Sequence, residues 1–300
     1  MSSERRATTV FRLLSDEIRL DILCAVAEAQ LEYEEYPEGP VQLSFSEIYE
    51  RVSVENTSKL SYHLGELDGV FLRKSEEGYS FTHVGERLTR FVLARNYEQP
   101  ASFEPIETAG SCPFCEAESL EARLHHQFLL ITCRECGQAV SNYQVTPTQV
   151  RTHDEQELIR SVKRKQATDY GLVRRGVCPE CTGSLSTEIR DLGSMLTFEA
   201  DPFFVFDRCS ECLRFYNALL TYGIAYHPAS VSFHWDHGVD VTPMGLWEFH
   251  EYLTEEQWTS RQVSTEPRRY EVEFRLEGDM LRCTVDGEAA VTGTERVRRR

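Results

Sequence analysis

The sequence predicts an α+β protein, and three observations support this fold class. Helical periodicity with one hairpin pattern fills residues 1–97, four C-x-x-C pairs follow between residues 112 and 212, and residues 223–300 mix helical and strand patterns. With 300 residues, of which 41% are hydrophobic, the chain is long enough to bury cores in two or three modules.

The charge balance is strongly acidic, with 49 Asp and Glu against 32 Lys and Arg and a formal net charge of -17. Only four of the basic residues are Lys. Carboxylates keep a surface hydrated at very high salt, so this balance predicts a haloarchaeal protein; an ordinary acidic mesophilic protein is the alternative. The start of the chain has no apolar targeting segment and no stretch is long enough to span a membrane, so we expect a cytoplasmic protein.

Residues 1–97 are predicted to form four helices, a hairpin and a fifth helix. "SDEIRLDILCAVAEA" has one apolar stripe, with Ser15 as its expected N-cap, and "SFSEIYERV" opens with a capping box of Ser44 and Glu47. The short turn "SVEN" leads into "TSKLSYHLGEL". "FLRKSEEGYSFT" alternates around an EEG turn and predicts a hairpin, and "VGERLTRFVLARNY" has helical spacing.

The fourth of these helices has the pattern of a DNA-recognition helix. At about 100° per residue, Leu60, Leu64 and Leu67 share one stripe, which predicts the buried side. Side chains able to hydrogen-bond base edges lie opposite or beside that direction, and the hairpin adds Arg73 and Lys74 for the phosphate backbone. The order helix, short turn, helix, hairpin, helix predicts a winged helix-turn-helix domain over residues 1–97.

These segments resemble the winged helix-turn-helix repressors of the ArsR type. The similarity covers roughly residues 7–97 and is carried by "FRLLSDEIRLDIL", "TSKLSYHL" and "YHLGELDGV". It implies a homodimer built from helices near residues 8–14 and 84–97. It also implies contacts with double-stranded DNA by a set of helix residues: Ser58, Lys59, Ser61, Tyr62 and His63. Metal-sensing members carry a Cys-x-Cys near the recognition helix, and "SFSEIYERV" has no Cys, so metal sensing at that site is not expected.

Residues 98–110, "EQPASFEPIETAG", are predicted to be a linker because they contain Pro and small residues. Beyond them, two segments share CPxC, a Ser-Leu pair, an apolar run and CxEC, which indicates an internal duplication. We therefore expect zinc ribbons at residues 111–150 and 177–222, joined by a connecting helix at residues 151–176.

Each repeat has the cysteine spacing of a structural zinc site. Seventeen residues separate the two C-x-x-C pairs of the first repeat and 27 separate those of the second. Four thiolates fill the coordination of Zn²⁺ and leave no open position, so we expect two structural zinc ions per chain. The predicted ligands are Cys112, Cys115, Cys133 and Cys136 in the first site and Cys178, Cys181, Cys209 and Cys212 in the second. Gly137 and Gly183 are expected to allow the turns. Disulfides, redox dithiols and interleaved sites are the alternatives.

The C-terminal region, residues 223–300, is predicted to be a small α+β region. The alternation of Val231, Phe233 and Trp235 favours a strand, "GLWEFHEYLTEEQW" a helix and "YEVEFRLEGDMLRCTVDG" a hairpin, followed by a solvated basic tail "ERVRRR". "LWEFHEYL" resembles the effector segment of haloarchaeal regulators that couple such a winged helix to zinc ribbons. A catalytic zinc site at His227, His234 and His237 is a rival interpretation, but these residues form no metalloprotease-type motif.

These patterns together predict a dimeric DNA-binding transcriptional regulator rather than an enzyme, with a C-terminal region that could bind a protein partner. The alternative is a zinc-ribbon module that binds RNA or the transcription machinery, using the ribbons and a basic patch at residues 160–175. Nucleophile-elbow, Walker and dinucleotide-binding motifs are absent from the sequence.

Overall fold

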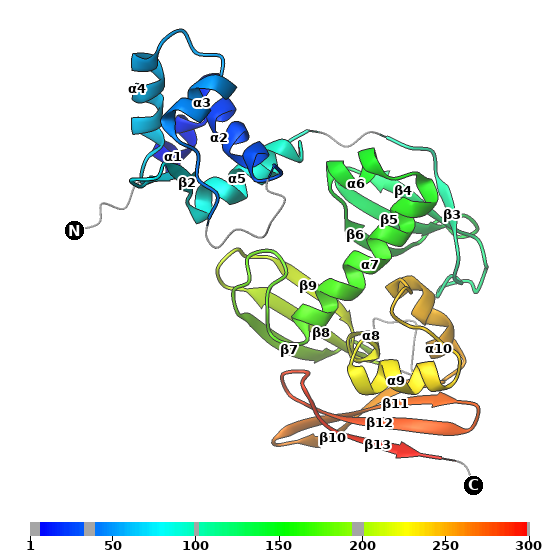
Figure 1. The fold of residues 1–300 in the computed structure, drawn as a ribbon. Coiled ribbons are helices and arrows are strands. Elements are labelled where there is room, and N and C mark those ends of the chain that lie inside the picture. The colour runs from blue at the N-terminus through cyan, green and yellow to red at the C-terminus, as the bar shows by residue number, and fades with distance from the viewer. Residues whose placement is uncertain (1–6, 33–39, 99–101, 194–200, 299–300) are drawn as a thin grey trace. The chain divides into compact units, whose positions relative to one another are not determined.

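A computed structural model describes residues 7–32, 40–98, 102–193 and 201–298. The chain divides into two compact units, unit 1 (Met1–Gln99) and unit 2 (Pro100–Arg300). The fold is α+β, as the sequence predicts: helices accompany four antiparallel sheets of two, four, three and four strands among the described residues (Figure 1). The acidic segment "EYEEYPEGP", residues 32–40, lies outside the described residues except at its two ends.

Unit 1 contains five helices and one hairpin in its described part, in the predicted order. They are α1 (Ala7–Leu13), α2 (Glu17–Ala29), α3 (Phe45–Arg51), α4 (Thr57–Leu67), β1 (Leu72–Lys74), β2 (Tyr79–Phe81) and α5 (His83–Leu93). The capping box of Ser44 and Glu47 begins α3, as predicted. The N-cap of α2 is Asp16, whose side chain accepts from Arg19 N; Ser15 instead donates to Arg12 O, so its predicted role was wrong.

The core of unit 1 lies between α2, α3, α4 and the hairpin. Leu60, Leu64 and Leu67 are at most 1% exposed, which confirms the predicted buried stripe of α4. They pack with apolar residues of α2 and α3 and with Phe71. Asn56 is the N-cap of α4, since its side chain accepts a hydrogen bond from Lys59 N at 2.9 Å.

Gly85 allows α5 to approach the chain at Phe71 closely. A Cβ at Gly85 would lie 1.9 Å from the carbonyl oxygen of Phe71, whereas a Cβ at Gly65 in α4 would meet nothing within 4 Å. Thr82, the N-cap of α5, fixes the same contact by donating its hydroxyl to Val70 O at 2.6 Å. Glycine at position 85 is therefore required by packing and not by its backbone angles.

Gly85→Ala is expected to lower the free energy of unfolding of unit 1 by about 2 kcal/mol, because backbone must move to admit the methyl group. Gly65→Ala is the matched control and is expected to stabilise α4 by up to about 1 kcal/mol, since alanine favours a helix. Hydrogen exchange of peptides from α2 and α4 measures both. Equal protection in the two variants would contradict the close approach of α5.

Unit 2 begins with two sheets that repeat one pattern. The first sheet has the order β3 (Ile106–Thr108), β4 (Leu120–His125), β5 (Phe128–Cys133) and β6 (Ala139–Gln144). The second has the order β7 (Leu185–Asp191), β8 (Phe203–Cys209) and β9 (Phe215–Leu219). Leu120 lies opposite Cys133, and Leu185 lies opposite Cys209, so the duplicated Ser-Leu and CxEC segments occupy equivalent places. The predicted linker is partly wrong, because β3 pairs with β4.

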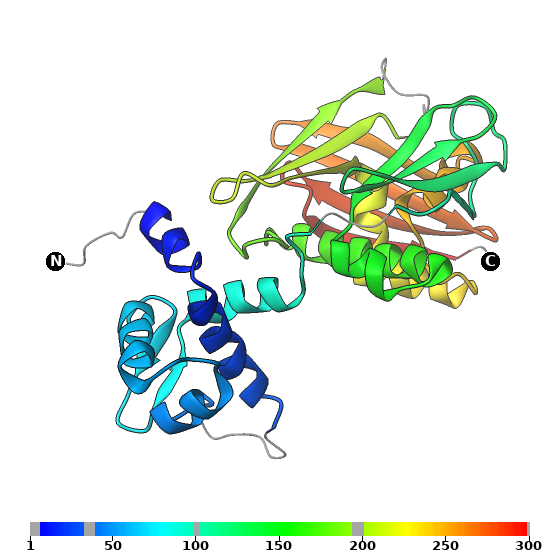
Figure 2. The same cartoon turned by 90° about the horizontal axis from the view of Figure 1, so that it is seen from above.

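Helices connect and cover these sheets. In the sequence, α6 (Pro147–Thr152) and the long helix α7 (Glu155–Val173) lie between the two sheets; α7 is the long green helix in Figure 2. Leu158, Ile159 and Val162 of α7 pack with β4, β5 and Trp247 in one core. The connecting helix is therefore an integral part of unit 2.

The C-terminal part differs from the prediction in three places. It contains α8 (Leu220–Ala225), α9 (Pro228–Asp236), a 3-10 turn (Leu246–Phe249), α10 (His250–Thr254) and the sheet β10 (Trp258–Thr265), β11 (Arg268–Leu276), β12 (Asp279–Asp286), β13 (Val291–Val297). The segment of Val231 and Phe233 is helix α9, not a strand. The predicted helix "GLWEFHEYLTEEQW" ends at Thr254, and Trp258 begins a strand. Part of the basic tail belongs to β13, whereas the hairpin of β11 and β12 is confirmed.

Candidate functional site: two cysteine clusters and a surface helix

The two sets of cysteines form two separate clusters. In each set the four sulfur atoms lie within 4.8 Å of one another. The closest pairs are Cys112–Cys136 and Cys115–Cys133 at 3.6 Å, Cys178–Cys212 at 3.6 Å and Cys181–Cys209 at 3.5 Å. A tetrahedron with Zn–S bonds of about 2.3 Å has edges of about 3.8 Å, so each cluster could hold one metal ion of that size. The predicted ligand sets are thus brought together as two sites and are not interleaved.

The four knuckles share one backbone geometry. The residue four positions after the first cysteine of each pair has a positive φ, between 61° and 72°, and its N–H donates to that cysteine's carbonyl. These residues are Glu116, Gly137, Thr182 and Leu213. Gly137 therefore has the predicted turn role, but Gly183 does not. A Cβ on Gly183 would lie 3.3 Å from Cys181 Sγ, so its role is to leave room for the sulfurs.

Backbone amides favour the thiolate form of two ligands. A hydrogen bond from the backbone N–H of Cys136 lowers the pKa of Cys133 to about 7, and that of Cys212 does the same for Cys209. Thiolates bind metal ions and thiols do not, so each amide favours the metal-binding form of one cysteine in its cluster. In each site two cysteines are buried and two are exposed.

The side chains of α4 divide between a buried and an exposed side. Ser58 and Ser61 are exposed, Tyr62 is 58% exposed, and Lys59 is partly exposed with its ammonium 3.4 Å from Glu55. In the hairpin that follows, Arg73 and Lys74 are also exposed. The predicted contact residues of α4, except one, therefore face away from the core of unit 1.

His63 is the exception, because it is only 4% exposed. Its Nδ1 lies 3.5 Å from Arg19 Nε and 3.6 Å from Asp16 Oδ1. The side chain thus joins α4 to the start of α2, and it is too buried to contact a nucleobase. At about 100° per residue, His63 lies next to the stripe of Leu60 and Leu64, and this position in the sequence is the signal that could have placed it on the buried side.

The helices predicted to form a dimer interface carry exposed apolar side chains. Phe11 of α1 is 63% exposed, and Val84 and Phe91 of α5 are 43% and 46% exposed. Tyr97, just after α5, is 62% exposed and contacts the ring of Phe91. This apolar surface lies within unit 1.

The histidines of the rival metal site are engaged by other groups. His227 caps α9 by accepting from Ala229 N, while His234 Nδ1 lies 2.7 Å from Ser230 O. His237 contacts Phe233 O and Asp279. Over the described ranges, only the two cysteine clusters bring three or more metal-ligating side chains together.

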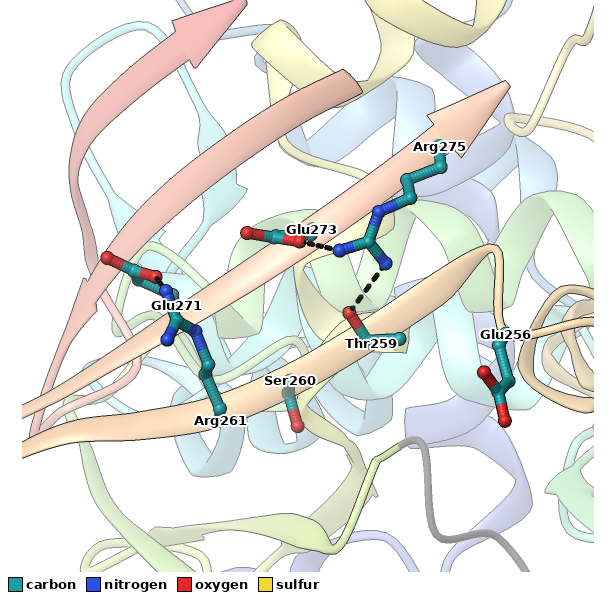
Figure 3. Close-up of a pocket in the computed structure, with 7 residues that line it drawn as sticks. All are labelled: Glu256, Thr259, Ser260, Arg261, Glu271, Glu273 and Arg275. Atoms are coloured by element: carbon teal, nitrogen blue, oxygen red, sulfur yellow. Dashed lines mark hydrogen bonds and ion pairs between the residues drawn. The ribbon is translucent and has the colours of Figure 1, made fainter. Parts of the chain in front are cut away.

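The positive charges of α7 are neutralised by nearby acids. Arg160 and Arg164 both bind Glu157, Lys165 binds Asp169, and Lys163 lies 2.7 Å from Glu248. A pocket on the outer face of β10 and β11 is similar: Arg261 binds Glu271, and Arg275 binds Glu273 (Figure 3). In both places most of the basic side chains are paired with acids.

Comparison with known families assigns the larger part of the chain. The family profile described as "Domain of unknown function (DUF7351)" matches residues 109–291, which is more than half of the chain. The chain belongs to the DUF7351 family. Its DUF7351 region contains both cysteine clusters, and a second profile, "Domain of unknown function (DUF7347)", matches residues 7–92 and includes α4. No curated protein and no solved structure matched the chain. None of the helices in the described residues combines the length and the apolar composition of a membrane span.

Proposed function

We propose that the protein is a DNA-binding transcriptional regulator with a winged helix-turn-helix domain in unit 1. Helix α4 enters the major groove of double-stranded DNA, and the β1–β2 hairpin is the wing beside it. The observation that carries the proposal is the two-sided character of α4, whose three leucines are buried while Ser58, Ser61 and Tyr62 face solvent. Arg73 and Lys74 on β1 bind the phosphate backbone.

The proposed regulator is a homodimer. Its exposed apolar residues on α1 and α5 supply a surface that a second copy would cover, and they include Phe11, Phe91 and Leu93. A dimer doubles the number of groove contacts. It therefore binds two half-sites about one helical turn of DNA apart.

The net charge of -17 is compatible with DNA binding in a cytoplasm of high salt. Four phosphate contacts lose about four orders of magnitude in affinity between roughly 0.2 M and 2 M salt, so ionic attraction contributes little there. Hydrogen bonds and apolar contacts in the groove then supply the affinity. The cysteine clusters of unit 2 hold two structural zinc ions, and that unit is a scaffold or a surface for a protein partner.

Selection from a random library of DNA duplexes near 2 M KCl is expected to enrich an inverted repeat. The double variant Lys59→Ala, Tyr62→Ala is expected to bind that repeat about a hundredfold more weakly, because good base contacts contribute about 1–3 kcal/mol each. Arg123→Ala, which removes one positive charge from an exposed position of β4 in unit 2, is the control and should bind as the native protein does. Fluorescence anisotropy measures all three.

Unchanged affinity in the double variant would overturn the role of α4. Binding in dilute buffer that is lost near 2 M KCl would instead refute only the high-salt account. The alternative function is a module for RNA or the transcription machinery that uses the ribbons and the basic patch at residues 160–175. It is not favoured as the main function because most of the basic side chains of that patch are paired with acids.

A further inference from the structure

The outer face of the sheet β7–β8–β9 carries three aromatic side chains: Phe215 is exposed, Phe204 and Phe206 are partly buried, and Phe204 packs against the core. Side chains alternate across a strand, and the buried face of β8 consists of Phe203, Val205 and Asp207. The opposite face therefore carries Phe204, Phe206 and Arg208. Phe215 of β9 pairs with Arg208 and therefore lies on this same face, where it is 44% exposed. We call Phe204, Phe206 and Phe215 the aromatic platform.

The rings of the aromatic platform form a continuous series. Phe204 and Phe206 have centroids 5.5 Å apart, and Phe206 stacks on Phe215 at 5.8 Å with an interplanar angle of 29°. Leu213, in the cysteine knuckle two residues before Phe215, is 75% exposed. Three adjoining rings partly open to water are unusual for a sheet face with no partner.

Arginines border these rings. The guanidinium of Arg190 lies over the ring of Phe206, 4.8 Å from its centroid, while Arg208 lies directly opposite Phe215 in the strand register. Glu188 is the acid on this face and binds Arg190. Two arginines against one glutamate make this face locally positive in a chain of net charge -17. This charge favours an anionic occupant over an apolar helix or a second copy of an acidic protein.

We propose that the aromatic platform binds single-stranded RNA. Unpaired bases expose π-faces that stack on aromatic rings, and Arg190 and Arg208 are placed to bind the phosphates between them. Base pairs in a duplex are already stacked and offer no such faces. The inference goes beyond the proposed binding of duplex DNA, because it uses a different unit and different residues.

Two polar side chains beside the aromatic platform favour RNA over single-stranded DNA. Ser186 lies opposite Arg208, and Asn217 lies opposite Phe206, both on the platform face and both exposed. The Ser186 hydroxyl donates to Arg208 O and keeps its lone pairs as acceptors. Hydroxyl and amide groups can bond a ribose 2′-hydroxyl, which DNA lacks.

The test is fluorescence anisotropy of the full-length, zinc-loaded protein with a labelled 12-nucleotide RNA of mixed sequence and no self-complementarity. Phe215→Ala is expected to weaken binding about tenfold, because one base loses the ring on which it stacks. Phe215→Trp should restore binding. Phe114→Ala is the control, because Phe114 is 47% exposed in the first cysteine knuckle and is not part of the aromatic platform. Arg208→Ala should weaken binding and reduce its salt dependence. For two phosphate contacts, the native affinity should fall by about 1.4 orders of magnitude per tenfold rise in salt.

Several results would overturn the proposal. They are the absence of RNA binding by the native protein, equal binding by Phe215→Ala, equal competition by DNA of the same sequence, and a change of oligomeric state in Phe215→Ala, which would make the face an interface between copies. Zinc content and circular dichroism show whether each variant is folded. The Lys59→Ala, Tyr62→Ala variant should bind RNA normally, so failure of the DNA-binding proposal is distinguishable from failure of this one.

Discussion

Removal of metal by a strong chelator is expected to unfold the part of unit 2 that contains β3–β9 and to leave unit 1 folded. Each cysteine cluster ties together two knuckles, and the buried cluster directly beside the second site is small in the described residues: it consists of Val173, Cys178, Cys209 and Tyr216. The strands between the knuckles bury their other apolar residues in larger cores that they share with α7 and the C-terminal elements. Structural zinc sites contribute about 10–16 kcal/mol in small zinc-finger peptides. Without the ion, each cluster contains four closely spaced thiols that no bond connects, so the two knuckles are no longer held together.

Metal analysis by mass spectrometry is expected to find two zinc ions per chain. Cys115→Ser and Cys181→Ser should each remove one of them, whereas Cys24→Ser in α2 is the control and should keep both. Hydrogen exchange should show β4 and β5 exposed in the first variant, and β7 and β8 in the second. Protected strands after chelation, or cysteines that resist alkylation in the denatured protein as disulfides do, would contradict structural zinc sites.

The cysteine clusters were predictable because their geometry is local. A C-x-x-C knuckle fixes both sulfurs within a few residues, and the spacing between knuckles matched the length of one hairpin. The buried stripe of α4 was predictable for the same reason, because Leu60, Leu64 and Leu67 record the helical period directly. In both cases the sequence pattern that predicts the contact lies on one helix or one hairpin.

Helix α9 was missed because two signals conflicted. The alternation of Val231 and Phe233 suggested a strand, but His227 and Pro228 form a helix start, with His227 as the N-cap and proline at the first position. Strand β13 was missed because six of its seven residues are exposed, so its sequence has no apolar alternation. Its structure depends on pairing with β12, which no local pattern records.

The aromatic platform was also beyond the sequence patterns. "FFVF" in β8 indicated a buried apolar strand, and only the register with β7 and β9 places Phe204 and Phe206 on the outer face. The same holds for the pair of Lys163 with Glu248, which lies far away in the sequence. The pairs of Arg160 with Glu157 and of Lys165 with Asp169 are local and follow from helical spacing.

Acidification from about pH 7 to about pH 4 is expected to destabilise unit 2 through two buried histidines. Burial lowers the pKa of His234 to about 4 and that of His250 to about 4, against 6.5 for a free side chain. A lowered folded-state pKa gives stability that is complete above about pH 6.5 and is lost as the pH falls toward 4. Each shift of about 2.5 units corresponds to about 3 kcal/mol. His234, surrounded by Trp258 and Phe274, is fully buried, so water screens this cost little.

Asp201 acts in the opposite direction. Burial raises its pKa to about 6 from 3.8, although Thr221 and Ser260 donate hydrogen bonds to it. A raised folded-state pKa gives stability that is complete below about pH 4 and is lost as the pH rises through about 6. Acidification thus regains up to about 3 kcal/mol at Asp201 while the two histidines together lose about 6 kcal/mol, so the histidines dominate.

Paired variants separate these contributions from acid release of zinc, which all variants share. Urea denaturation followed by tryptophan fluorescence reports on unit 2, because all three Trp lie there. Between about pH 7 and 4, His234→Phe should lose about 3 kcal/mol less stability than the native protein. Asp201→Asn should lose about 3 kcal/mol more, because it lacks the compensating carboxyl. Parallel pH profiles for all three proteins would show that neither group titrates abnormally in the folded state, and the buried positions of His234 and Asp201 would then be incorrect.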